Sequence, residues 1–126
     1  TGLATPEQAE RTVKMLSRLE CDFGVAGCEK RDDLLDFQWD YPHGWACLHY
    51  IVIYGLNRYG YNEDAKRIAA KYCDLVERNF EATGNIWEKY NVVEGKVSET
   101  KEGKHKIAAL MMGWSAGVYL YCIENK

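Results

Sequence analysis

Apolar residues recur three and four positions apart along most of the chain, and this spacing predicts helices. Four such stretches can be read, separated by polar, irregular segments. They run from Pro6 to a stop at Gly24, from about Gly44 to Gly60, from Asn62 to Thr83, and from about Lys106 to Ile123. Their apolar faces contain Ala9, Val13, Leu16 and Leu19; Trp45, Leu48, Ile51, Val52 and Leu56; Ala65, Ile68, Ala69, Tyr72, Leu75 and Val76; and Ile107, Leu110, Met111, Trp114, Val118 and Tyr121.

Helix-end signals support these assignments. Thr5 and Gln8 form a Thr-x-x-Gln capping box around Pro6, which suits the first helical position. Asn62 is the expected cap of the third helix, and Gly84 follows that helix as a stop. No long stretch alternates between apolar and polar residues, although Val92 to Val97 could form a short hairpin. The chain is therefore predicted to be mainly α.

Composition restricts the function classes. The 126 residues have a net charge of −3 and a pI near 5.6, with no excess of Lys or Arg, which argues against a nucleic-acid or anionic-membrane partner. No apolar run approaches the roughly 20 residues that span a bilayer. Five cysteines without CxxC spacing indicate neither a disulfide framework nor a zinc site, so no metal or cofactor is expected. The start lacks a signal-peptide pattern, which favours a cytoplasmic location, but Thr1 in place of Met leaves room for an upstream segment.

The first candidate for chemistry is "QWDYPHGW", residues 38–45. Trp39 and Trp45 offer flat apolar faces, whereas Gln38 and Asp40 offer hydrogen bonds. A sugar ring has an apolar C–H face and a rim of hydroxyls, so this mixture suits a sugar. The alternative is a Trp-rich packing corner in which Asp40 caps the following helix.

The second candidate is "NIWEKYNVVEG", residues 85–95. Glu88 lies between Trp87 and Tyr90, aromatic neighbours that can desolvate a carboxylate and favour acid or base catalysis. A solvated Glu88 beside Lys89 is the alternative.

These two stretches carry a family resemblance. "QWDYPHGW" resembles the trehalase signature Gln-Trp-Asp-x-Pro-x-Gly-Trp and matches it at every fixed position. "WEKYNV", which follows "EATGN", resembles the family's Glu-Lys-Tyr-Asp/Asn-Val stretch after a Thr-Gly helix stop. "MGWSAGVYLYCI" is similar to the start of the family's last helix. The resemblance covers nearly the whole chain but only the C-terminal quarter or so of a complete trehalase.

The resemblance implies that residues 1–126 are one segment, the closing part of an (α/α)6 toroid that hydrolyses α-linked glucosides such as trehalose with inversion. By carry-over Glu88 is the general base, while Gln38, Trp39, Asp40, Trp45 and Trp114 bind the sugar. The family's catalytic acid is an aspartate upstream of the signature. A partner chain or a missing N-terminal segment is therefore expected to carry it.

Two departures from the family pattern keep other readings open. The interval after Glu88 has no glycine-rich loop with a Glu-Tyr pair, and Ser115 and Ala116 replace the family's Thr-Asn. Related toroid α-glucosidases and α-mannosidases share the Trp-rich helix start and a Trp-Ser-Ala last helix. A sugar-binding module without the acid, or a helical interaction domain, are the further alternatives.

Overall fold

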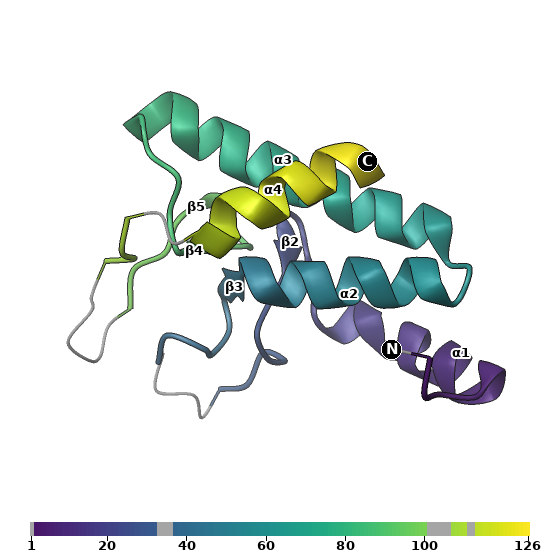
Figure 1. Ribbon diagram of the computed structural model, residues 1–126. Coiled ribbons are helices and arrows are strands. Elements are labelled where there is room, and N and C mark those ends of the chain that lie inside the picture. Colours follow the sequence, from purple (N-terminus) through teal and green to yellow (C-terminus); the bar gives the residue numbers. More distant parts are fainter. Residues whose placement is uncertain (1, 33–36, 101–106, 111–112) are drawn as a thin grey trace.

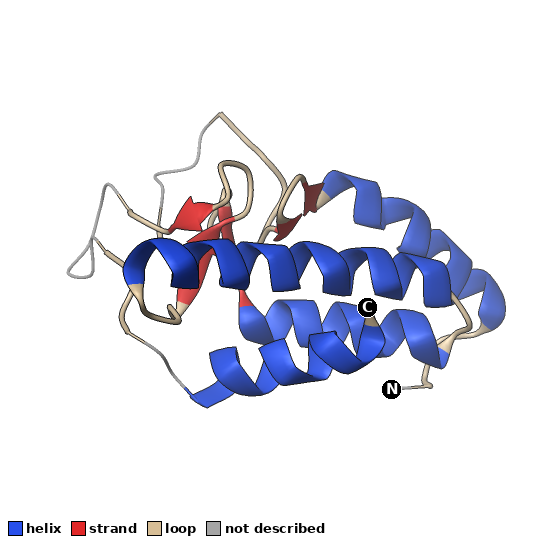
Figure 2. Cartoon of the chain, turned by 90° about the horizontal axis from the view of Figure 1, so that it is seen from above, coloured by secondary structure: helices blue, strands red, loops and turns tan. Residues whose placement is uncertain are grey.

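The computed structural model describes residues 2–32, 37–100, 107–110 and 113–126. Within these ranges it is mainly α, as predicted, with short strands gathered toward one end of the helices (Figures 1 and 2). The elements are α1 Pro6–Met15, η1 Leu16–Arg18, β1 Glu20–Cys21, β2 Gly24–Val25, β3 His43–Trp45, α2 Ala46–Arg58, α3 Asn62–Thr83, β4 Lys89–Asn91, β5 Lys96–Val97 and α4 Gly113–Asn125.

The start of α1 follows the predicted capping box. The Gln8 N–H donates to the Thr5 hydroxyl (3.3 Å), and the Thr5 N–H donates to the Gln8 side chain (2.8 Å). The predicted end at Gly24 is wrong. The helix tightens into the 3₁₀ turn η1, and the chain then turns back as the β1–β2 pair, with Glu20 opposite Val25. The apolar spacing could not reveal this, because the strands are only two residues long.

Helices α2 and α3 form an antiparallel hairpin on which α4 packs (Figure 1). The predicted extent of α3 is confirmed, and Gly84 ends it in the left-handed conformation with φ +71°. The predicted cap is wrong: Asn62 is the first helical residue, and the N-cap residue is Tyr61, which makes no side-chain cap. Side chains on its inner face are fully buried and form the centre of the core: Ala65, Ile68, Ala69, Tyr72, Leu75 and Val76.

The last helix starts later than predicted, because the described residues 107–110 are not part of it. Its predicted first residue, Lys106, and Met111 lie outside the described residues. Ile107 and Leu110 are not helical: they bridge to Glu99 and Trp87, and each side chain is 59% exposed. Helix α4 begins at Gly113 instead, and buries Val118 and Cys122 against the core.

A three-stranded antiparallel sheet, in the order β3–β4–β5, lies at the base of the α2–α3 hairpin. Its first strand contains Gly44, so the predicted helix start there is wrong and α2 begins at Ala46. The predicted 92–97 hairpin is displaced: β4 ends at Asn91 and β5 begins at Lys96, so the intervening residues form the turn. Residue pairs join β3 to β4 at His43–Asn91, Gly44–Tyr90 and Trp45–Lys89.

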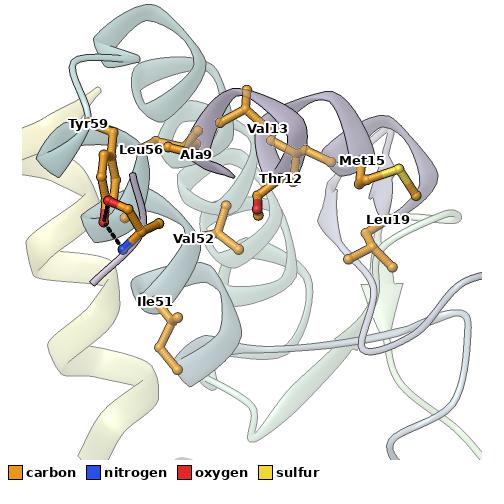
Figure 3. A pocket seen from close by; sticks show the side chains of 12 residues that line it. Ala9, Thr12, Val13, Met15, Leu19, Ile51, Val52, Leu56 and Tyr59 are labelled. Carbon is orange, nitrogen blue, oxygen red and sulfur yellow. Dashed lines mark hydrogen bonds between the residues drawn. The ribbon is translucent and has the colours of Figure 1, made fainter. Parts of the chain in front are cut away.

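An apolar groove of about 330 Å³ separates α1 from α2 (Figure 3). The predicted buried stripe of α2 is wrong at Ile51, which is 63% exposed and lines this groove; Ala46, His49, Ile53 and Leu56 are the buried positions of the helix. At the rim of the groove the Ala4 N–H donates to the Tyr59 hydroxyl (2.8 Å). In the described part of the chain, no helix has both the length and the apolar character that a membrane crossing requires.

Candidate active site

The pairing of β3 with β4 brings the two sequence motifs together although α2 and α3 separate them in the chain. Trp45, the last residue of the first motif's strand, lies opposite Lys89, the residue directly after Glu88. One motif leads into α2 and the other follows α3. Because these helices are antiparallel, both motifs lie at the same end of the hairpin (Figure 1).

Three indoles form the apolar part of this end. Trp39 stacks on Trp45 with ring centroids 3.9 Å apart and planes at 6°, and Trp114 from α4 meets Trp45 edge-on at 6.0 Å. Trp45 is only 2% exposed, whereas Trp39 is 44% and Trp114 is 37% exposed. Trp39 and Trp114 therefore present the accessible indole surfaces, and Trp45 lies beneath them.

The polar residues of the first motif hold its own loop. The Trp45 indole N–H donates to the Gln38 carbonyl (2.9 Å). One carboxylate oxygen of Asp40 accepts the Phe37 N–H (3.0 Å), and the Asp40 carbonyl accepts the His43 N–H (2.9 Å). The alternative in which Asp40 caps the following helix is wrong, since α2 has no side-chain cap and its N-cap residue is Trp45. Within the described residues, the Gln38 side chain is exposed and the second carboxylate oxygen of Asp40 has no hydrogen-bond partner.

Glu88 stands just before β4 and is partly exposed. Its backbone N–H donates to the Ala109 carbonyl (2.9 Å). Its carboxylate has no hydrogen bond or ion pair with any residue in the described ranges. The neighbouring Lys89 is buried, and its ammonium lies 5.7 Å from the centre of the Trp45 ring. Within the described residues, no group of three acidic, His or Cys side chains is arranged to hold a metal ion.

His49 is one of the polar residues buried near the site. The Val25 N–H donates to its Nε2 (2.9 Å), and its Nδ1 lies 2.8 Å from the Trp45 carbonyl. A backbone N–H can only donate and a carbonyl can only accept, so these partners place the proton on Nδ1 and require a neutral ring. Burial lowers the pKa of His49 to about 4, and the bond to the Trp45 carbonyl acts in the opposite direction.

We expect this buried histidine to make stability depend on pH. The unfolded chain takes up a proton near pH 6.5 and the folded chain only near pH 4, so stability is complete above pH 6.5 and decreases as the pH falls toward 4. The loss through His49 should approach about 3 kcal/mol at pH 4, from roughly 1.4 kcal/mol for each unit. Urea unfolding between pH 7 and 4.5 measures it. His49→Gln should flatten the slope between pH 6.5 and 5, where carboxylates barely titrate; an unchanged slope would show that another group is responsible.

The sequence did not point to Thr83, Ala109 or His49, although all three hold the site. His49 had a detectable signal, because an imidazole about one turn into an apolar helix needs polar partners when it is buried. Ala109 acts through its carbonyl. Thr83 is the last residue of α3, and its hydroxyl accepts the Trp87 indole N–H (2.9 Å) across the turn that follows the helix. Backbone acceptors and turn geometry leave no signature in side-chain spacing.

A family model and two curated relatives that match this chain are all described as trehalases. The family model described as Trehalase matches residues 1–126. A probable trehalase of Saccharomyces cerevisiae is 38% identical over 102 residues, which cover 75% of this chain and 13% of that protein. The cytosolic neutral trehalase of Beauveria bassiana is 30% identical over 143 residues, covering 98% of this chain and 19% of that protein.

The fold agrees with a solved structure of the same kind. The neutral trehalase Nth1 from Saccharomyces cerevisiae superposes with a TM-score of 0.81 and 30% identity, over 99% of this chain and 22% of that one. The chain thus spans about a fifth or less of the length of these proteins. The match over the whole chain and the shared fold show that this chain belongs to the trehalase family.

Proposed function

We propose that this chain is the part of an inverting α-glycosidase, acting on an α-linked glucoside such as trehalose, that supplies the general base and one wall of the glucose subsite. The observation that carries the proposal is the β3–β4 pairing. It places the stacked indoles of Trp39 and Trp45 beside the strand that starts directly after Glu88, whose carboxylate has no partner within the described residues.

Each residue has a stated role in this proposal. The exposed indole of Trp39, supported by Trp45, packs against the C–H face of the sugar, and Trp114 adds a second aromatic wall. Gln38 and Asp40 hold sugar hydroxyls. Glu88 removes a proton from the attacking water on the face opposite the leaving group. A carboxylate that is not already in an ion pair is available for that task.

Inversion also needs a catalytic acid, placed about 6.5–9.5 Å from the base so that a water molecule fits between them. We assign the acid to another segment of a longer protein or to a partner chain, because this chain covers only 13–22% of the length of these relatives. Residues 1–126 would then close an (α/α)6 toroid. A cytoplasmic location goes with the proposal, since several relatives, including those from Emericella nidulans and Beauveria bassiana, are named cytosolic neutral trehalases.

A second candidate is a related toroid enzyme that acts on another α-glucoside or an α-mannoside, or a sugar-binding module that lacks the acid. Ser115 and Ala116 favour this candidate, because they depart from the trehalase pattern in the helix that also carries Trp114.

The hydrolytic function is tested in a chimera. Here the matching C-terminal segment of the Saccharomyces cerevisiae neutral trehalase is replaced by this chain, and we call the product the trehalase chimera. It should hydrolyse trehalose, whereas the isolated chain should not, because general acid help alone is worth a factor of about 10²–10⁴. A folded chimera that cleaves an α-mannoside or another α-glucoside but not trehalose would favour the second candidate.

Sugar binding is tested in the isolated chain. An iminosugar analogue of glucose should change the indole fluorescence, and Trp39→Ala should abolish the change. Tyr54→Ala is the matched control, because Tyr54 is 42% exposed, like Trp39. Tyr54 lies in α2, nine residues after Trp45, which is about 13 Å along the helix axis at 1.5 Å per residue. A response that survives Trp39→Ala would remove Trp39 from the proposed sugar wall.

A further inference from the structure

Trp87, the residue before Glu88, is held at both of its N–H groups. Its backbone N–H donates to the Tyr90 hydroxyl (2.9 Å), and its indole N–H donates to the Thr83 hydroxyl (2.9 Å). We propose that Thr83 and Tyr90 are positioning residues that fix Trp87 and thereby orient Glu88 toward the water it activates. This inference rests on the proposed role of Glu88. We call the three residues Thr83, Trp87 and Tyr90 the Trp87 clamp.

The Tyr90 side of the clamp is anchored in the core. Tyr90 is 1% exposed, lies between Gly44 and Val97 in the sheet, and meets the Tyr72 ring edge-on at 6.5 Å. A side chain enclosed in this way has little freedom, so its hydroxyl oxygen is a fixed acceptor. Burial raises the pKa of Tyr90, which keeps this hydroxyl neutral, while the Trp87 N–H acts in the opposite direction.

The Thr83 side of the clamp is anchored to the end of α3. The Thr83 hydroxyl donates its only proton to the Asn79 carbonyl (2.7 Å), and its oxygen accepts both the Trp87 indole N–H (2.9 Å) and the Asn85 N–H (3.3 Å). Asn79 is itself buried, and its amide donates to the carbonyls of Leu75 (2.7 Å) and Gly95 (3.2 Å). The clamp therefore connects α3 to the turn that precedes Glu88.

The backbone is also fixed at Glu88 and after it. The Glu88 N–H donates to Ala109, and Lys89 pairs with Trp45 in the sheet. With the peptide groups on both sides held, the torsions of the Glu88 side chain are the freedom that remains. A base must be placed accurately, since a misplacement of about 1 Å can lower the rate about 100-fold. Release of Trp87 should therefore reduce turnover without changing the sugar-binding surface of Trp39.

The test compares two buried tyrosines in the trehalase chimera. Tyr90→Phe removes the acceptor of the Trp87 N–H and is expected to lower kcat about 10- to 100-fold with KM changed less than threefold. Tyr72→Phe is the matched control, because within the described residues the Tyr72 hydroxyl has no hydrogen-bond partner. It should leave both constants unchanged. In the isolated chain, amide hydrogen exchange at Trp87 should be faster in Tyr90→Phe, whereas exchange at Ala69 in α3 should not change.

A second pair of variants tests the other side of the clamp and does not disturb the core. Thr83→Val removes the hydroxyl and should lower kcat in the same direction, and Thr83→Ser keeps a hydroxyl and should restore it. This pair decides the question if Tyr90→Phe does not fold. A kcat within twofold of the parent in both Tyr90→Phe and Thr83→Val, while Glu88→Gln is inactive, overturns the positioning role alone. Full activity of Glu88→Gln overturns the base assignment and the inference with it.

Discussion

In the trehalase chimera, Glu88→Gln should lower kcat for trehalose by a factor of about 10²–10⁴ and change KM little. Glutamine keeps the size and hydrogen-bonding ability of the side chain but cannot accept a proton from water. The Glu88 carboxylate has no hydrogen bond or ion pair with the residues that the structure describes, so its replacement should leave the stability of the fold nearly unchanged. Initial rates of glucose release and urea unfolding of the same preparations measure the two effects.

Azide provides the chemical control for this result. In Glu88→Ala the shortened side chain leaves space from which the anion can attack on the face normally used by water. Azide should restore part of the turnover of an activated α-glucoside and release a β-glycosyl azide. Near-normal kcat in both Glu88→Gln and Glu88→Ala would show that Glu88 is a structural loop residue.

Asp40→Asn is the matched carboxylate change, and it should behave differently. A charge-assisted hydrogen bond to a sugar hydroxyl is worth about 1.5–3 kcal/mol. In Asp40→Asn, KM should therefore rise and kcat should fall. The Phe37 N–H can still be accepted by the amide oxygen, which preserves the loop. A variant with a strongly reduced kcat and unaltered binding would instead indicate that Asp40 takes part in the chemistry.

The largest effect on stability is expected from Gly44→Ala. A methyl group at this position in β3 would lie 2.7 Å from the Val25 carbonyl oxygen and even closer to a methyl carbon of Val92. The first of these atoms belongs to the backbone and cannot rotate away. We expect a loss of about 1–3 kcal/mol or more in the free energy of unfolding. Because Gly44 pairs with Tyr90, the near-ultraviolet signal of the surrounding aromatic residues should change as well.

Gly117→Ala is the matched control for this substitution. Gly117 lies within α4, and a methyl group added there would meet no atom of the other described residues within 4 Å, apart from its own helix turn. Alanine favours a helix over glycine by roughly 0.5–1 kcal/mol, so this variant should be slightly more stable than the parent. Urea unfolding of the two variants separates the effect of crowding from the effect of removing a glycine. Equal stability of Gly44→Ala and the parent would mean that β3 moves away without loss.

The helices could be predicted where the local pattern determines them. Ala65, Ile68 and Tyr72 follow the period of a helix and are buried in one, and Thr5 with Gln8 caps another. The same apolar spacing predicted a helix wrongly where the backbone pairs with a segment distant in the sequence. Ile107 and Leu110 continue the spacing of Trp114, but their segment pairs with Trp87 and Glu99 instead. Side-chain spacing contains no information about hydrogen bonds to a distant backbone.

The site could be predicted in its residues but not in its arrangement. The motif resemblance singled out Trp39, Trp45 and Glu88, which the structure brings to one end of the hairpin. It did not predict that Trp45 would be buried under Trp39, because a flat stack depends on the loop around Asp40. Nor did it predict the Trp87 clamp, which joins residues three and four positions apart through a turn rather than a helix.

The β3–β4 pairing also determines where the chain can change in length. It joins the two ends of the α2–α3 hairpin, so the site is insensitive to what happens at the opposite tip, where Gly60 turns the chain with φ +82°. The entropy of closing a loop grows slowly, by about 0.6 kcal/mol for each doubling of its length. Insertions at this tip should therefore be tolerated in relatives, whereas a single added residue within β3 or β4 would turn every following side chain to the other face of the sheet.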